Sequence, residues 1–283
     1  MPRVVIAGCG FLGEAAAFLF LERGWRVLGL CATEASAARF SGAPFRVIAT
    51  DIASAPVVPE GWEAPDVLIH CASSGRGGAD AYRSVYVEGM ANLLAAFRPV
   101  RPIFTGSTSV YAQVDGSIVT EESPAEPDRE TGRLLLEAEG LALSAGGAVA
   151  RLAGIYGPGR SVLLRKFLEG SAVLEAGGHR WINQIHRDDA AVALVRLATG
   201  TTGVFNVSDN MPATQRDVYG WIAHFLDRPL PPEGPADLQR KRGWTSKRIS
   251  NARLRGLGWE PRFPSYKDAL PGLVVQASRS QSA

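Results

Sequence analysis

The sequence lacks the features that mark several large classes of protein. Its 3 cysteines, Cys9, Cys31 and Cys71, are an odd number and form no CxxC or Cys/His cluster, which excludes a disulfide framework and gives no metal-ligand spacing. The formal net charge of +2 gives no strong field of one sign for nucleic acid. No window approaches the roughly 18 uncharged apolar residues of a membrane helix. Glu14 and several glycines interrupt the apolar start, which is therefore no signal peptide. We expect a soluble, unprocessed chain in the reducing cytoplasm, with no metal and no membrane partner.

Short apolar runs alternate along the chain with longer helical patterns. The runs are nearly continuous in Val, Ile and Leu, which indicates strands buried on both faces of a parallel sheet. The predicted fold class is therefore α/β, a Rossmann-type doubly wound parallel sheet with a smaller C-terminal substrate-cap subdomain. The expected strands are RVVIAG, RVLGL, FRVIAT, DVLIHCA, RPIFTGS, a segment of GGAVARLAGIYG, and GVFNVS at 203–208; the expected helices are 11–23, about 80–97, one from about 129, and about 215–226.

The first expected strand runs into a glycine-rich turn, VVIAGCGFLGEAAAF. Gly8, Gly10 and Gly13 stand where only glycine permits a tight turn, a close approach of the backbone to a pyrophosphate, and a close helix-strand contact. The helix then begins at Phe11 and Leu12, whose N–H groups face the phosphates. A strand precedes this motif and a helix follows it, which favours a dinucleotide-binding site over an ordinary turn. We therefore predict an NAD(P) site. We expect a cofactor domain at 1–160, with later strand contributions near 180–208, and mainly the cap at 161–283.

The residue at the end of the second strand bears on the choice of cofactor. Sites that grip the 2′-hydroxyl of NAD place an acidic residue there, and this chain has Cys31. Because no carboxylate at that position repels a 2′-phosphate, the sequence favours NADP, while NAD stays open. Thr33 and Arg39 are candidates to take the phosphate, although Arg39 also suits a solvated helix position. The cysteines near these strand ends are interpreted as small buried side chains.

Several further motifs follow in a characteristic order: TDIAS, HCASSG, GSTSVYA, RLAGIYGPGR, NQIHRDDAA and KRISNARLRGLGWEP. Together they resemble the extended short-chain dehydrogenase/reductase superfamily, the NAD-dependent epimerases and dehydratases acting on nucleotide sugars. The resemblance covers nearly the whole chain and implies the same fold. It also implies cofactor contacts at Asp51, Ile52, Cys71, Ala72, Ser73 and Tyr156, and substrate contacts at Ser107, Asn183 and Arg248.

The resemblance breaks in the segment RETGRLLLEAEG. Members of the superfamily carry Tyr-x-x-x-Lys there, in which the Tyr transfers a proton and the Lys lowers its pKa. This chain has Thr131 and Leu135 at the two positions, and no Tyr anywhere is followed by Lys four residues later. An aliphatic hydroxyl ionises too weakly to serve as an acid or base alone, and Leu135 supplies neither charge nor donor. The usual proton relay is therefore absent from this helix.

Other residues are weaker candidates for the missing chemistry. Ser107 stands in the place of the family's catalytic serine and could orient a substrate oxygen, or it could cap a turn. Tyr111 could supply the proton, although packing is the simpler role. His186 titrates near neutral pH in principle, but its motif is mainly structural in the family. Asp188 and Asp189 suit the first turn of the following helix.

Three functions remain open from the sequence. The leading hypothesis is an oxidoreductase or epimerase that acts on a nucleotide-sugar-like or carbonyl/carbinol substrate by hydride transfer, with a non-standard proton donor. The alternative is a catalytically inactive NAD(P)-binding redox sensor or scaffold. A weaker alternative, an RNA-binding relative, rests on the basic stretch Arg240–Arg255 around Trp244, which equally suits a diphosphate site or a solvated loop. The resemblance also implies a homodimer, paired through the helices near 80–97 and 130–145.

Overall fold

The computed structural model describes residues 1–75, 77–237 and 244–281. These residues form two units whose segments interleave along the chain. Unit 1 comprises residues 1–110, 126–151 and 191–205, and unit 2 comprises residues 111–125, 152–190 and 206–283. A single boundary at residue 160 does not describe this division. Residues 111–125 belong to unit 2 although they precede that boundary, and residues 191–205 belong to unit 1 although they follow it.

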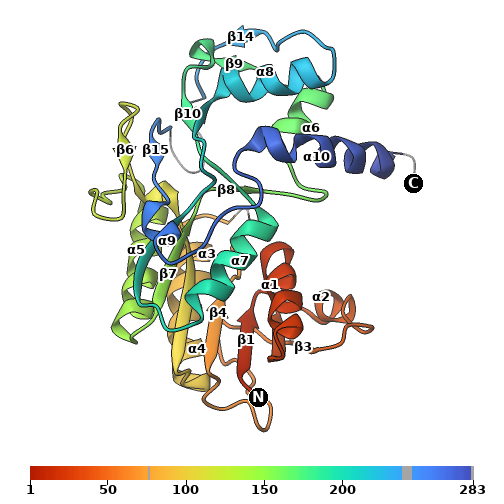
Figure 1. Cartoon of the computed structure of the whole chain (residues 1–283). Helices are drawn as coiled ribbons and strands as arrows, with labels where there is room; N and C mark the ends of the chain where they lie inside the picture. Colours follow the sequence, from red (N-terminus) through yellow and green to blue (C-terminus); the bar gives the residue numbers. More distant parts are fainter. Residues whose placement is uncertain (76, 238–243, 282–283) are drawn as a thin grey trace. The chain divides into compact units, whose positions relative to one another are not determined.

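A seven-stranded sheet organises unit 1, in the order β12-β7-β5-β4-β1-β2-β3 (Figure 1). Strand β1 pairs in parallel with β2 on one side and with β4 on the other, and the parallel pairing continues to β3 and β5. This arrangement confirms the predicted doubly wound α/β fold. The strands are β1 (Arg3–Ala7), β2 (Arg26–Cys31), β3 (Arg46–Ala49), β4 (Val67–His70), β5 (Arg101–Ser107), β7 (Ala148–Leu152) and β12 (Gly203–Val207).

The strands next to the centre of this sheet carry almost no solvent-accessible side chain. Val5, Leu28 and Leu68 are fully buried and join a core cluster with Leu93 and Phe97 from a covering helix. Burial on both faces explains why their sequence runs are continuously apolar. The expected helix at 80–97 is interrupted by a π-helical stretch, η1. The helices of unit 1 are α1 (Phe11–Glu22), α2 (Glu34–Ala38), α3 (Ala79–Tyr82), η1 (Arg83–Glu88), α4 (Gly89–Phe97), η2 (Thr108–Val110) and α5 (Glu130–Ser144); α7 (Arg187–Leu197) begins in unit 2 and continues into unit 1.

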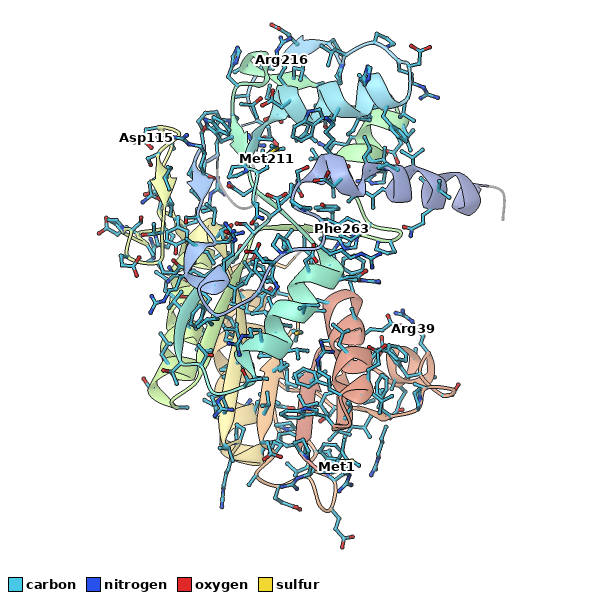
Figure 2. The ribbon with its side chains drawn as sticks, in the orientation of Figure 1. Met1, Arg39, Asp115, Met211, Arg216 and Phe263 are labelled. Carbon is cyan, nitrogen blue, oxygen red and sulfur yellow. The ribbon has the colours of Figure 1, made fainter. Side chains whose placement is uncertain are left out.

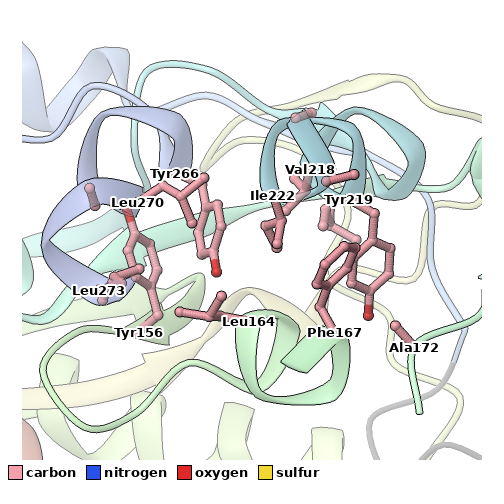
Figure 3. Packing of buried hydrophobic residues seen from close by; sticks show 14 of the residues in the cluster. Tyr156, Leu164, Phe167, Ala172, Val218, Tyr219, Ile222, Tyr266, Leu270 and Leu273 are labelled. Carbon is pink, nitrogen blue, oxygen red and sulfur yellow. The ribbon is translucent and has the colours of Figure 1, made fainter. Parts of the chain in front are cut away.

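Unit 2 is built from short strands and helices around its own apolar core (Figure 3). In this core, Phe167 stacks on Tyr219 with the ring centroids 6.2 Å apart, and Tyr156 lies 4.8 Å from Tyr266. Helix α8 begins with a capping box, in which Thr214 and Asp217 bond each other's backbone N–H groups. The elements are β6 (Ile118–Val119), β8 (Gly154–Tyr156), α6 (Val162–Leu168), β9 (Leu174–Glu175), η3 (Ala176–Gly178), β10 (Trp181–Ile182), β11 (Gln184–His186), β13 (Ala213–Thr214), α8 (Gln215–Phe225), β14 (Glu233–Gly234), β15 (Arg248–Ile249), α9 (Ala252–Arg255) and α10 (Tyr266–Gln281).

Candidate functional site

The glycine turn between β1 and α1 has the geometry that a dinucleotide requires. Gly8 has φ +93°, and a Cβ there would lie 2.3 Å from the backbone N of Ala72. A Cβ on Gly13 would lie 2.3 Å from the carbonyl oxygen of Gly8. A Cβ on Gly10, in contrast, would meet nothing within 4 Å, so this glycine leaves open space beside the first turn of α1. Gly8 therefore permits the tight turn, Gly13 permits the close helix-strand contact, and Gly10 leaves room for a pyrophosphate. Together these three glycines fit the binding of NAD(P).

The carboxyl end of β2 combines a buried thiol with a nearby cation. Burial raises the pKa of the Cys31 thiol, and the guanidinium of Arg39 opposes that rise. Arg39 has the same lowering influence on Cys9, whose pKa burial raises to about 12. Arg39, which directly follows α2 (labelled in Figure 2), therefore exerts its charge on Cys31 at the end of β2. Thr33 caps α2 instead of standing free: its hydroxyl accepts from Ser36 N at 3.2 Å.

The other expected cofactor residues of unit 1 lie at neighbouring strand ends. Asp51 follows β3, and its carboxylate accepts from Ala53 N at 2.9 Å, which fixes the turn there. The Ile52 carbonyl accepts from the Asn92 side chain at 3.1 Å. Cys71 N donates to Ala7 O at 2.7 Å and so extends the β1–β4 pairing toward Ala72, beside Gly8. The Ser73 hydroxyl accepts from Gly75 N at 3.3 Å. Unit 1 thus gathers the predicted residues at the ends of β1, β3 and β4, while their contact with a cofactor stays a prediction.

Helix α5 carries Thr131 and Leu135, the residues at the family's Tyr and Lys positions. Leu135 is only 5% exposed and is one of the apolar residues that α5 buries against its own unit. Thr131 is half-buried one turn earlier. Farther along the helix, Glu139 forms a buried bidentate ion pair with Arg151 of β7, with a shortest N–O distance of 2.7 Å. The face that would carry the relay is therefore packed as part of the fold.

Ser107 lies at the end of β5 and is buried. Its hydroxyl oxygen accepts a hydrogen bond from Ser109 N at 3.2 Å, so it stabilises the turn into η2. The hydroxyl hydrogen can still be donated to a substrate oxygen, because a serine oxygen both accepts and donates. The catalytic role of Ser107 stays a prediction, and its turn-stabilising role is visible in the structure.

Tyr111, a candidate proton donor, and Tyr156, a candidate cofactor contact, both belong to unit 2. Tyr111 is fully buried, and its hydroxyl donates to Asn206 Oδ1 at 2.9 Å. Tyr156 is also buried among apolar residues, and burial raises the pKa of its phenol. Its hydroxyl has no hydrogen-bond partner among the residues that the structure describes. Both rings are fixed by packing; the proton transfer suggested for Tyr111 and the cofactor contact suggested for Tyr156 stay predictions.

The remaining motif residues of unit 2 hold its segments together. The Asn183 side chain donates to Lys247 O at 3.0 Å and accepts from Ile249 N at 2.8 Å, which ties it to β15. The Asp189 carboxylate accepts from the backbone N–H groups of Arg262 and Phe263 at 2.7 and 3.0 Å. Asp189 therefore anchors the loop before α10 as well as standing in the first turn of α7. The substrate contact expected at Asn183 stays a prediction.

Where the structure describes the basic stretch, its cations have partners within the chain, although Arg253 and Arg255 are exposed. Arg240, Lys241 and Arg242 lie outside the described residues. Arg248 donates to Gly116 O at 2.8 Å and its guanidinium lies 5.2 Å from the centre of the Trp181 ring. The remaining described cations of the stretch are also engaged: Lys247 is buried, Arg253 pairs with Glu122, and Arg255 pairs with Glu260.

Sequence reasoning missed the residues that surround a cavity in unit 2. Arg180 and Trp181 line this cavity and lie outside every motif discussed above. Lys247 follows the lining residue Ser246 and is not part of the lining; it was counted in a stretch interpreted as solvated or phosphate-binding. Lys247 is 3% exposed, and burial lowers the pKa of its amine to about 8. These side chains come from segments far apart in the chain, and no local spacing connects them.

Within the described residues, no helix combines the length and apolar character needed to cross a bilayer. Likewise, no group of His, Cys, Asp and Glu side chains in that part of the chain has the arrangement of a metal site. The three cysteines are free thiols.

Known proteins resemble this chain over almost its whole length. Protein YeeZ of Escherichia coli K12 is 28% identical over 275 residues, covering 93% of this chain and 97% of that protein. The 3-diazoavenalumate denitrifying reductase of a Streptomyces species is 28% identical over 307 residues, covering 95% and 99%. The structure of DesIV, a dTDP-glucose 4,6-dehydratase from Streptomyces venezuelae with NAD bound, superposes with a TM-score of 0.83 at 20% identity, covering 99% and 98%. At that identity, the likeness to DesIV concerns the fold.

The family itself is shown by a match to most of the chain. The model of the NAD dependent epimerase/dehydratase family matches residues 4–208, which include the glycine turn, the strand ends described above and the degenerate helix α5. This match confirms the resemblance seen in the sequence motifs. The chain therefore belongs to the NAD dependent epimerase/dehydratase family.

Proposed function

We propose that this protein is an NAD(P)H-dependent reductase that transfers a hydride to a small substrate without a Tyr–Lys proton relay. The observation that carries the proposal is the glycine turn, where Gly8 and Gly13 are sterically required and Gly10 leaves space for a pyrophosphate. A nicotinamide cofactor, when bound, supplies the hydride. The intact turn, together with an α5 helix that buries Leu135, favours retained cofactor chemistry with an altered proton path.

The missing relay limits the substrates that this site suits. A carbonyl needs a proton on its oxygen as hydride arrives, whereas an electron-poor acceptor has less need of a protein acid at that moment. One of the relatives is named as a reductase of a diazo compound, while DesIV is a nucleotide-sugar dehydratase. We therefore propose reduction of an activated substrate ahead of nucleotide-sugar epimerisation or dehydration. Ser107 would orient the substrate, with water as the proton donor where one is needed; Tyr111 could replace water only if its hydroxyl gave up its hydrogen bond to Asn206.

We further propose that NADP is preferred over NAD. Cys31 stands where an acidic residue would repel the 2′-phosphate, and the Arg39 charge acts on the same strand end. A guanidinium is well suited to a phosphate because it offers charge and several donors in one plane. The free thiols support the expected cytoplasmic location. The homodimer also stays a prediction; within unit 1, helix α5 contacts η1, β5 and α3.

The test of the proposed function separates cofactor binding from turnover. Gly10→Val places a side chain in open space, so the fold is retained, but it obstructs the pyrophosphate; we expect NADPH affinity to fall at least about tenfold, roughly 1.4 kcal/mol. Gly42→Val is the matched control, because a Cβ there also meets nothing within 4 Å. Binding is measured by the fluorescence of NADPH, and unfolding temperatures are compared in parallel.

Turnover is then measured as NADPH oxidation with aldehydes, ketones, aryl diazo compounds and nucleotide sugars. Oxidation with one of the first three classes, lost in Gly10→Val, supports the reductase. Tight NADPH binding with no turnover on any substrate contradicts it and favours the redox sensor or scaffold. Equal NADPH affinity in Gly10→Val and the unmodified protein would place the cofactor elsewhere and overturn the proposed site.

A further inference from the structure

Tyr86 places a phenol at the carboxyl end of the central sheet, close to the glycine turn. Its hydroxyl accepts a hydrogen bond from Ser74 N at 3.4 Å. Ser74 belongs to the loop that leaves β4, and the backbone of Ala72 in this loop lies against Gly8, where a Cβ would be 2.3 Å from Ala72 N. The partner of the phenol therefore lies two residues along the chain from the contact with the glycine turn, within unit 1.

The strand order indicates which half of the proposed cofactor this loop would meet. A dinucleotide lies across the carboxyl ends of the strands, with its pyrophosphate at the glycine turn after β1. The ribose with the 2′-hydroxyl meets the end of β2, so the adenosine half takes the β2 side of β1. Strands β4 and β5 lie on the other side of β1. The nicotinamide half therefore takes the side on which Ser74 and Tyr86 lie.

The Tyr86 ring is held by three neighbouring rings. It is 7% exposed and packs edge-on against Tyr82 and Phe104, with ring centroids 4.9 and 6.1 Å away. The fully buried His70 ring lies 6.0 Å from it, and His70 Nε2 donates to Val85 O at 2.9 Å. That bond ties the π-helical stretch η1 to the end of β4, and π-helical stretches are frequent at functional sites. The phenol is therefore fixed in position before any ligand binds.

The hydroxyl hydrogen of Tyr86 is available to a ligand. A phenol oxygen both accepts and donates, and the bond from Ser74 N uses only its accepting capacity. The hydrogen has no acceptor among the described residues, whereas the Tyr111 hydroxyl donates to Asn206. Helix η1 also packs against α5, the helix that lacks the family's tyrosine. A neighbouring helix of the same unit thus supplies a phenol.

We propose that Tyr86 is the proton donor of this reductase for carbonyl substrates, in place of the tyrosine that α5 lacks. Hydride adds to the carbonyl carbon, the Tyr86 O–H bond breaks, and its proton goes to the carbonyl oxygen, which gives an alcohol and an oxidised cofactor. The tyrosinate then regains a proton from water. A phenol is a far stronger acid than the aliphatic hydroxyl of Thr131. The inference rests on the proposed reductase function and assigns to Tyr86 the step that otherwise falls to water.

Carbon-13 NMR of the protein labelled at tyrosine Cζ tests the position of the phenol without turnover. NADP⁺ should shift the resonance that Tyr86→Phe removes, because the nicotinamide half lies beside it. Adenosine 2′,5′-bisphosphate, which lacks that half, should leave the same resonance in place. An unshifted Tyr86 resonance in protein saturated with NADP⁺ would overturn the proposal and leave the cofactor site standing.

Single-turnover reduction of 4-nitrobenzaldehyde, or of the most active carbonyl compound in the turnover panel, then tests the proton transfer. The rate is followed by NADPH absorbance. Tyr86→Phe should lower it at least about 100-fold, a usual contribution of a general acid, and leave NADPH affinity within about twofold. The matched control is Tyr82→Phe, which removes the hydroxyl of a neighbouring tyrosine that is 4% exposed. This control should keep the rate of the unmodified protein, and unfolding temperatures show that both variants are folded.

The outcomes separate this inference from the proposed function. An unchanged rate in folded Tyr86→Phe, or an equal loss in Tyr82→Phe, would overturn Tyr86 as the donor and leave the reductase intact. Reduction of aryl diazo compounds alone would do the same, because no carbonyl oxygen then needs a proton. NADPH binding without turnover on any substrate would instead overturn the reductase, and the inference with it.

Discussion

The two units differ in how their candidate sites are built. In unit 1 the predicted cofactor site is made chiefly of backbone: glycines at the end of β1 and strand ends that lie side by side. In unit 2 the cavity is made of side chains, among them Arg180, Trp181 and Trp244, which come from separate segments. A site made of backbone tolerates changes in neighbouring side chains, and this explains how unit 1 keeps its turn while α5 has lost the relay residues.

The units also differ in how they treat buried charge. The Glu139–Arg151 pair of unit 1 is neutralised internally by bidentate hydrogen bonds. The buried Lys247 of unit 2 has only neutral oxygens as hydrogen-bond partners among the described residues. Buried ions are costly unless they are paired, so an unpaired buried cation points to a role other than stability. The first of three predictions tests this difference, and the other two test the candidate site of unit 1.

The largest effect is expected from the pH dependence of stability at Lys247. Its pKa is lowered by burial from 10.5 to about 8, so between these pH values the unfolded chain holds a proton that the folded chain has released. Stability therefore rises with pH across this window, by up to about 3 kcal/mol at 1.36 kcal/mol per pKa unit. Lys247→Met should remove this rise, as measured by urea unfolding at pH 7 to 10.5.

The matched control for Lys247 is Lys166→Met, which removes an exposed lysine of α6. This control should follow the same pH profile as the unmodified protein. Identical profiles for Lys247→Met and the unmodified protein would show that burial does not lower the pKa of Lys247, and the contrast between the units would disappear.

A smaller effect is expected from Arg39, the side chain that would add specificity to the backbone site of unit 1. Arg39→Ala should weaken NADP binding about tenfold, near 1.4 kcal/mol, through loss of a charge-assisted contact to the 2′-phosphate. NAD binding should change less than about twofold. Arg46→Ala, at the opposite end of the neighbouring strand β3, is the control for a general loss of positive charge. Equal losses for the two cofactors would remove Arg39 from the 2′-phosphate site.

The smallest effect is expected at the degenerate Tyr position. Thr131→Val should change the kcat of hydride transfer less than about twofold, because an aliphatic hydroxyl is too weak an acid for the step. Ser107→Ala should lower kcat at least about tenfold in the same assay of NADPH oxidation if Ser107 orients the substrate. A large loss of kcat in Thr131→Val would instead indicate that Thr131 on α5 takes part in proton transfer.

Much of unit 1 was predictable because its signals are local in sequence. Continuous apolar runs correctly indicated the strands of the central sheet, and the GxGxxG spacing indicated the turn whose sterics the structure displays. The π-helical stretch Arg83–Glu88 was not predicted, since its apolar pattern also suits an ordinary helix. The interleaving of the units was equally hidden, because it depends on which distant segments pack together.

The sequence by itself determined the family, the parallel sheet, the glycine turn and the absence of the Tyr–Lys pair. Each of these depends on residue type and short spacing. Only the tertiary structure decided that Leu135 is packed, that Asn183 and Asp189 tie loops together, and that Arg180 and Trp244 share one cavity. The physical reason is that burial and unsatisfied hydrogen bonds arise where distant segments meet, and no local pattern records that meeting.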